Sequence, residues 1–143
     1  MSALARLAIT DGAGRTVAAT ARLLDLAAPL AVERFRRALP IREPLRHVRW
    51  SGEAGYVLVP ELVDPGLALE NRMSFFCRGV IGFRPEHGEL AIAYGSAQAR
   101  DWWGIGWATR IAQLEGDADA FLAAVEGTQR GGVRELLIEA EVG

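Results

Sequence analysis

Residues 46–53 hold a dense set of side chains that could bind a ligand or move a proton, in the order Arg46-His47-Val48-Arg49-Trp50-Ser51-Gly52-Glu53. Successive side chains of a β-strand point to opposite faces of its sheet. As a strand, this stretch would place His47, Arg49 and Ser51 on one polar face. Val48 and Trp50 would then face a hydrophobic core. The pattern predicts a candidate site held on a rigid element.

The chemistry expected of this site is the binding of a small molecule. The planar guanidinium of Arg49 suits a carboxylate or an amide oxygen, to which it donates parallel hydrogen bonds. His47 and Glu53 are placed to orient such a ligand or to exchange protons with it. Small-molecule pockets also need an apolar wall. The candidates for that wall are Tyr94, Trp102 and Trp103.

Some of these residues also have a purely structural interpretation. Arg49 could form a salt bridge with Glu53 or Glu70, which would hold a loop against the fold. Asn71 ends a long loop, where it could contact the ligand or bond to the local backbone as a turn former. The sequence leaves both interpretations open for Arg49 and for Asn71.

Trp102 and Trp103 are adjacent, so on a regular element they cannot both face inward. An exposed tryptophan indicates either a lid over a pocket or a contact with another molecule. We favour the contact and expect a homo-oligomer. A structural, oligomeric subunit without a ligand is therefore one alternative to a binding protein.

Composition excludes several classes of function. The formal net charge of −2 argues against nucleic acid as a partner, because phosphate binding requires a basic surface. All 16 basic residues are arginine, which excludes a lysine nucleophile. Cys77 is the single cysteine and is expected to be a buried small hydrophobe. With His47 and His87 as the only histidines, the sequence predicts no metal site and no cofactor.

No stretch has the pattern of a signal peptide, and no apolar run approaches the ~20 residues that span a bilayer. We therefore expect a cytoplasmic protein with no membrane partner.

Short strands dominate the expected secondary structure. Alternating apolar and polar residues predict strands over 3–10 and 15–24, joined by a glycine-rich turn at 11–14. In the second of these runs, alternation predicts an inward-facing set of Val17, Ala19, Ala21 and Leu23. The remaining expected strands are 46–53, 56–59, 75–83, 89–94, 104–114 and 133–142.

Two segments have helical periodicity instead. One ends at Pro40 and has an apolar stripe of Val32, Phe35 and Leu39. The other is expected over 118–126, with Asp117 as its N-cap and Gly127 as its C-terminal glycine. About eight strands and two helices in one domain, residues 1–143, predict a mainly β fold. We expect a closed, eight-stranded antiparallel β-barrel capped by the two α-helices.

The order of elements resembles that of a cyclophilin. The proline-led helix of residues 28–39 is similar to the helix that caps one end of the cyclophilin barrel. The chain is more similar to a family of uncharacterised bacterial cyclophilin-like proteins, and the resemblance covers about residues 16–140. It is carried by a strand pair like Gly79 to Tyr94, and by Arg49-Trp50-Ser51-Gly52-Glu53, Glu70-Asn71 and Tyr94-Gly95. The resemblance implies a cyclophilin-like barrel.

The same resemblance implies prolyl isomerase activity as one alternative function. Arg46 or Arg49 matches the arginine of an isomerase, but residues 84–89 replace its asparagine-rich segment and no histidine follows His87. We therefore expect a protein that is not an isomerase and that binds a small polar or carboxylate-bearing metabolite near Arg49. A further alternative is an enzyme or accessory subunit acting on small amide-type metabolites.

Overall fold

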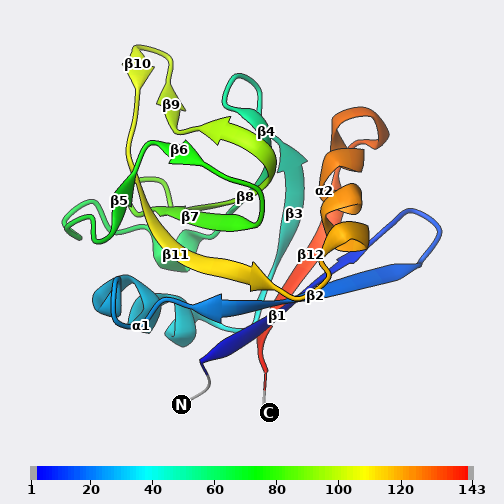
Figure 1. Ribbon diagram of the computed structural model, residues 1–143, viewed down its shortest axis with the longest axis horizontal. Coiled ribbons are helices and arrows are strands. Elements are labelled where there is room, and N and C mark those ends of the chain that lie inside the picture. The colour runs from blue at the N-terminus through cyan, green and yellow to red at the C-terminus, as the bar shows by residue number, and fades with distance from the viewer. Residues whose placement is uncertain (1–2, 142–143) are drawn as a thin grey trace.

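Eight strands close into an antiparallel barrel in the computed structural model, which describes residues 3–141 (Figure 1). Each strand pairs with the next in the order β2-β1-β12-β3-β4-β8-β7-β11, and β11 pairs back onto β2. Their bounds in chain order are β1 Leu4–Thr10, β2 Thr16–Leu23, β3 Ile41–His47, β4 Gly52–Leu58, β7 Val80–Arg84, β8 Glu89–Gln98, β11 Ala108–Glu115 and β12 Arg134–Ala140. The mainly β, closed eight-stranded fold with two helices is confirmed.

Four short strands and a 3-10 turn lie outside the ring. β5 pairs with β11 and β6 with β8, whereas β9 and β10 form a two-stranded sheet of their own. Figure 1 shows β6, β9 and β10 above β7 and β8, and β5 at the left of β7. Their bounds are β5 Arg72–Met73, β6 Phe75–Phe76, β9 Arg100–Asp101, β10 Gly104–Ile105 and the turn η1 Pro60–Leu62. Of these segments, β6 and the β9–β10 hairpin line the outer face of the sheet.

Both helices pack into the core of the barrel. Helix α1 spans Pro29–Ala38 and buries Ala31, Val32 and Phe35. Helix α2 spans Asp119–Gly131 and buries Phe121, Leu122, Val125 and Thr128. The inward set expected on β2 is confirmed, because Ala19, Ala21 and Leu23 are buried in the same core and Val17 packs against it. No helix within residues 3–141 is long and apolar enough to span a membrane.

The start of α1 is capped from a distant loop. The carboxylate of Glu70 accepts hydrogen bonds from the backbone N–H groups of Leu30 at 3.3 Å and Ala31 at 2.9 Å. These N–H groups have no acceptor within the helix, and a negative charge is favourable at a helix N-terminus. Glu70 therefore has a structural role.

Several local predictions are corrected by the structure. Residues 48–51 form the connection between β3 and β4 rather than part of a strand, so Trp50 is 56% exposed instead of belonging to the core. Cys77 is exposed. Helix α2 continues past Gly127, and it is Gly132, with φ of 83°, that follows its end. The last strand ends at Ala140, and residue 142 of its predicted range lies outside the described residues.

Candidate functional site

The outer face of strands β4, β8 and β7 is the floor of a groove. Leu58, Glu89 and Arg84 lie side by side across these three strands at one level. At the next level the row is Tyr56, Ala91 and Gly82. Intervening residues such as Leu90 and Phe83 point into the barrel core, as strand alternation requires. The outer row is therefore polar at one end and made of small side chains in the middle.

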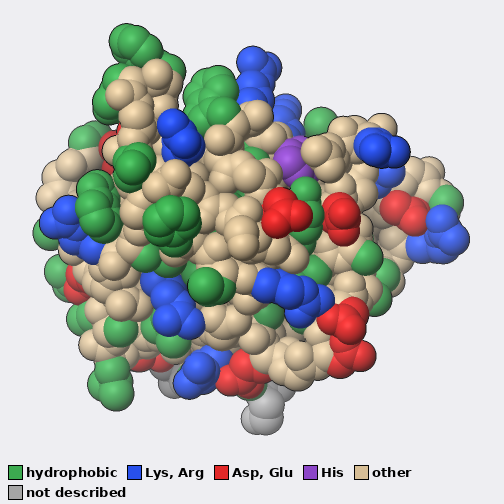
Figure 2. Space-filling view, turned by 45° about the horizontal axis from the view of Figure 1, so that its top comes forward, with side chains coloured by type: hydrophobic (Ala, Val, Ile, Leu, Met, Phe, Trp, Pro, Cys, Tyr) green, Lys and Arg blue, Asp and Glu red, His purple; other side chains and the backbone are tan. Residues whose placement is uncertain are grey.

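Small floor residues leave a hollow of about 660 Å³. Ala54, Ala91, Ala97 and Ala99 line it, and Phe76 forms one wall. A Cβ atom at Gly82 would overlap the ring of Phe76, so this wall depends on a glycine in β7. The other walls are the β3–β4 connection and the β9–β10 hairpin. Figure 2 shows hydrophobic side chains standing out at the upper left, over that hairpin.

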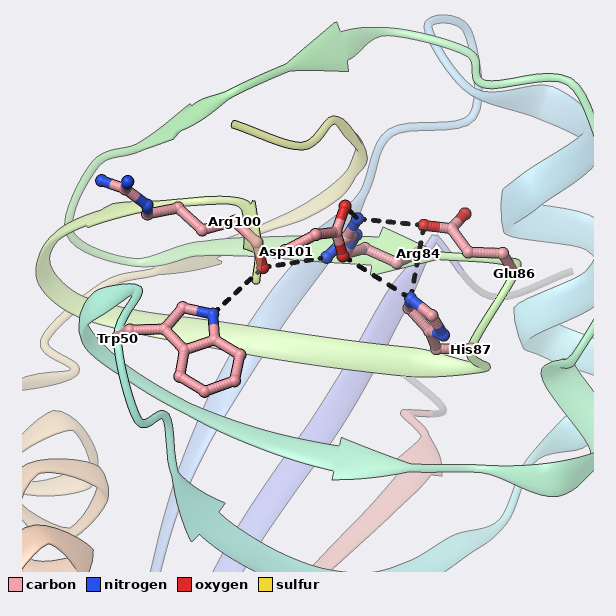
Figure 3. Close-up of polar contacts among 6 residues, drawn as sticks. All are labelled: Trp50, Arg84, Glu86, His87, Arg100 and Asp101. Atoms are coloured by element: carbon pink, nitrogen blue, oxygen red, sulfur yellow. Dashed lines mark hydrogen bonds and ion pairs between the residues drawn. The ribbon is translucent and has the colours of Figure 1, made fainter. Parts of the chain in front are cut away.

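Arg84 is the centre of an ion-pair network at the polar end of the groove (Figure 3). Its Nη2 lies 2.9 Å from Oδ2 of Asp101 and 3.1 Å from Oε1 of Glu86. Nε2 of His87 lies 3.8 Å from Glu86 and 3.9 Å from Asp101. The Arg84 side chain is 8% exposed and that of Asp101 14%. A buried charge of this kind requires a partner, and Asp101 supplies it.

The network is closely covered by the chain. A Cβ atom at Gly106 would lie 2.7 Å from Nη2 of Arg84 and 3.1 Å from Oδ2 of Asp101, so glycine is needed for this approach. The carbonyl of Arg100 accepts hydrogen bonds from Arg84 at 3.5 Å and from the Trp50 indole at 3.4 Å. No described residue accepts a hydrogen bond from Nε of Arg84.

Two pKa values in this network are shifted from their usual range, those of Glu89 and Arg84. Burial raises the pKa of the Glu89 carboxyl, and the charges of Glu86 and Asp101 add to the rise while Arg84 and His87 oppose it. Burial alone would lower the pKa of Arg84, but its hydrogen bond to Asp101 and the surrounding carboxylates outweigh burial and raise it. Arg84 thus stays charged, and the Glu89 carboxyl is protonated more easily than an exposed glutamate.

Four of the eight predicted site residues line this groove, namely Arg49, Ser51, Trp102 and Trp103. Arg49 has no ion-pair partner within residues 3–141, so the predicted salt bridge to Glu53 or Glu70 does not form. Both tryptophans are at the tip of the β9–β10 hairpin, 83% and 66% exposed, and their rings meet edge to face at 5.3 Å.

His47 and Tyr94 lie together beside the groove. His47 ends β3, and its Nε2 is 2.7 Å from the Tyr94 hydroxyl, while its Nδ1 is 2.7 Å from the carbonyl of Val48. His47 and Arg49 also line a second hollow of about 580 Å³ beside the end of α2. Burial raises the pKa of the Tyr94 phenol. Both rings therefore hold the β3–β4 connection and do not line the groove.

Glu53 and Asn71 lie outside the groove. Glu53 accepts a hydrogen bond from the Ser96 backbone N–H at 3.0 Å. Asn71 has a left-handed backbone with φ of 46°, and its side-chain amide donates to the carbonyl of Arg110 at 3.0 Å. The Asn71 side chain therefore bonds to the backbone of β11, which is distant in the sequence, and not to the local backbone as a turn former would.

The polar end of the groove was not predicted from the sequence. It consists of Arg84, Glu86, His87, Glu89 and Asp101. A signal is present in hindsight, because residues 84–89 place four polar or charged side chains and a proline between two apolar strands. No local pattern indicates that Asp101 would pair with Arg84. Within residues 3–141 no three His, Cys, Asp or Glu side chains are arranged to hold a metal ion.

Two solved structures are similar to this chain. The structure of McbB in complex with tryptophan matches with a TM-score of 0.74 and 16% identity, over 97% of this chain and 45% of McbB. The solution structure of the hypothetical protein AF2241 from Archaeoglobus fulgidus matches with a TM-score of 0.62 and 14% identity, over 99% and 98% of the two chains. This chain spans less than half of McbB, and at these identities the likeness concerns the fold alone.

No protein of curated function matches the sequence. The model of the family described as "Protein of unknown function (DUF3830)" matches residues 11–138. Because this range covers most of the 143 residues, the chain belongs to the DUF3830 family.

Proposed function

We propose that this chain binds a small carboxylate-bearing molecule with a flat apolar part in the outer groove. The observation that carries the proposal is an alanine-floored hollow with two rim arginines, Arg49 and Arg100, that have no carboxylate partner within residues 3–141. A guanidinium stays charged and offers a planar fork of donors, which suits a ligand carboxylate.

The aromatic rim supports the flat part of the ligand. Trp50, Trp102 and Trp103 line the groove and are each more than half exposed. Aromatic rings gain most from stacking when a partner removes them from water. The volume of about 660 Å³ lies within the range of known small-molecule pockets. The fold neighbour McbB was solved with tryptophan, which combines a carboxylate with a flat ring and is a suitable first probe.

The test is a titration of the purified protein with indole-3-propionate, 3-phenylpropionate, L-tryptophan and L-phenylalanine. Calorimetry and thermal-shift measurements detect the binding. A ligand that binds only the folded state raises the unfolding temperature with its concentration. We expect binding to weaken by about tenfold or more in Arg49→Gln combined with Arg100→Gln, because charge-assisted hydrogen bonds are lost. The control is Arg6→Gln, an exposed arginine on β1.

Two results would contradict this function. If none of the probes binds at millimolar concentration, small carboxylate-bearing molecules with a flat apolar part are excluded as ligands. Binding that the Arg49→Gln and Arg100→Gln changes leave intact would place the ligand elsewhere. We also propose that the cyclophilin-like barrel is not an isomerase, and we expect equal rates of cis–trans exchange in a proline peptide with and without the protein.

A second proposal concerns assembly. We infer that the chain associates with copies of itself through the end that carries β9 and β10. Large exposed apolar side chains there are Trp50, Phe75, Trp102, Trp103, Ile105 and Trp107. An exposed apolar surface of this kind is typical of contact sites.

A further inference from the structure

The groove has opposite charges at its two ends. Glu86, Glu89 and Asp101 surround the buried cation Arg84 at one end, which leaves an excess of negative charge there when all three carboxyls are ionised. Figure 3 shows the guanidinium of Arg100 extending away from this network, on the side opposite Glu86 and His87. Arg100 and Arg49 make the other end positive.

Two carboxylates of the negative end face the hollow. Glu89 lies on the same face of β8 as Ala91, and both residues line the groove. Asp101 also lines it and uses Oδ2 for Arg84, while its Oδ1 has only His87 at 3.9 Å. These carboxylates therefore have acceptor oxygens available for a donor that enters the groove.

The desolvation of this end favours a cation over a neutral donor. An ionised carboxylate in a partly buried site is stabilised by a nearby positive charge more than in water, because the local dielectric is lower. Arg84 cannot provide the whole of this charge, since it is held by Asp101 and Glu86. A ligand ammonium would complete the neutralisation of Glu89.

We propose that the groove selects zwitterions: the amine of the ligand binds at Glu89 and Asp101, and its carboxylate binds at Arg49 and Arg100. This inference rests on the proposed function, which requires only the carboxylate. The ligands of this class are aromatic amino acids and short peptides that end in one, because both combine an amine, a carboxylate and a flat ring.

The experiment compares each zwitterion with a partner that lacks the amine. L-Tryptophan is paired with indole-3-propionate, and glycyl-tryptophan with N-acetyltryptophan, so that two distances between amine and carboxylate are tested. Of the two zwitterions, we expect the one that binds more tightly to have an affinity about tenfold or more higher than that of its amine-free partner. Glu89→Gln should erase that difference, because the ligand ammonium then loses its carboxylate partner on β8. Glu89→Asp should restore it in part, and Glu61→Gln, an exposed glutamate outside the groove, is the control.

The pH dependence gives an independent test. As pH falls through the raised pKa of the Glu89 carboxyl, protonation removes its negative charge. The groups that face Glu89 are Arg84, Glu86, His87 and Asp101, and the protonation of Glu89 makes this end of the groove less negative. The affinity for the zwitterion should therefore decrease as the pH is lowered. Calorimetry in buffers of different ionisation enthalpy should show that the protein releases protons when the zwitterion binds.

The outcomes separate this inference from the proposed function. Equal binding of zwitterions and amine-free partners, lost in the Arg49→Gln and Arg100→Gln protein, would overturn the zwitterion inference and leave the proposed function standing. An amine preference that survives in a folded Glu89→Gln protein would also overturn it. If L-tryptophan, indole-3-propionate, glycyl-tryptophan and N-acetyltryptophan all fail to bind, both the zwitterion inference and the proposed function are overturned.

Discussion

At the scale of single residues, Arg84 determines the character of the groove. Its charge is almost completely removed from water, and it is held by a carboxylate from β9 that lies 17 positions later in the chain. A buried ion pair contributes little net stability when intact, but the loss of one partner leaves a charge without compensation. The pair therefore makes the structure sensitive to one specific substitution.

We expect Asp101→Asn to lower the free energy of unfolding by about 3 kcal/mol, the lower end of the range for a broken buried pair, because Glu86 still contacts Arg84. Urea denaturation at neutral pH measures this change. The matched control is Glu135→Gln, which breaks the exposed pair with Arg42 and should change the stability by less than about 1 kcal/mol. Equal effects of the two substitutions would show that the Arg84–Asp101 pair is not desolvated in solution.

At the scale of elements, the groove exists because a glycine in β7 allows β6 to lie against that strand. Phe76 of β6 is buried over Gly82, and the alanines of β4 and β8 leave space beside it. A larger side chain at position 82 would move the Phe76 ring into that space. The floor of the hollow is thus produced by a missing Cβ atom and by small neighbours.

We expect Gly82→Ala to destabilise the protein by about 1–3 kcal/mol, which is typical of an overpacked site. Because the new methyl group displaces Phe76, binding of any groove ligand should weaken as well. Thermal or urea denaturation gives the first quantity and a ligand titration the second. Gly12→Ala is the control, since a Cβ atom there meets no atom within 4 Å. An unchanged stability in Gly82→Ala would mean that Phe76 moves away freely.

At the scale of the whole molecule, the barrel separates two apolar regions. The main core fills its interior and includes both helices, while a smaller cluster lies on the outer face below β6 and β9. Exposed tryptophans continue this outer cluster to the surface. The outer region is therefore partly exposed to solvent, in contrast to the core.

We expect the wild-type protein to sediment as a dimer or larger oligomer at micromolar concentration, and Trp102→Ser with Trp103→Ser to shift it towards monomer. Both side chains are exposed, so the double substitution should leave the unfolding temperature of the monomer nearly unchanged. Leu26→Ser is the control, because Leu26 is fully exposed. It precedes α1, which Figure 1 shows at the opposite end of the molecule from β9 and β10. A wild-type monomer at this concentration would contradict the assembly proposal.

The sequence by itself determined the elements and the fold class. Alternation placed Ala19, Ala21 and Leu23 in the interior, and the i, i+3 spacing of Val32 and Phe35 identified the buried face of α1. Such patterns are local, because a strand or helix repeats its orientation to the core at a fixed period. The approximate bounds of most barrel strands followed for the same reason.

Only the tertiary structure decided the site. The strand predicted through Arg49 and Trp50 is a connection, since glycine at position 52 adopts φ of 105° and starts β4 there. Glu70 caps a helix that begins 41 positions earlier, and Glu89, Arg84 and Asp101 meet through strand register and the return of β9. Pairing between strands and contacts between loops depend on closure of the barrel, which no local period encodes. The sequence therefore determined a barrel, and the packing of its outer segments determined where a ligand could bind.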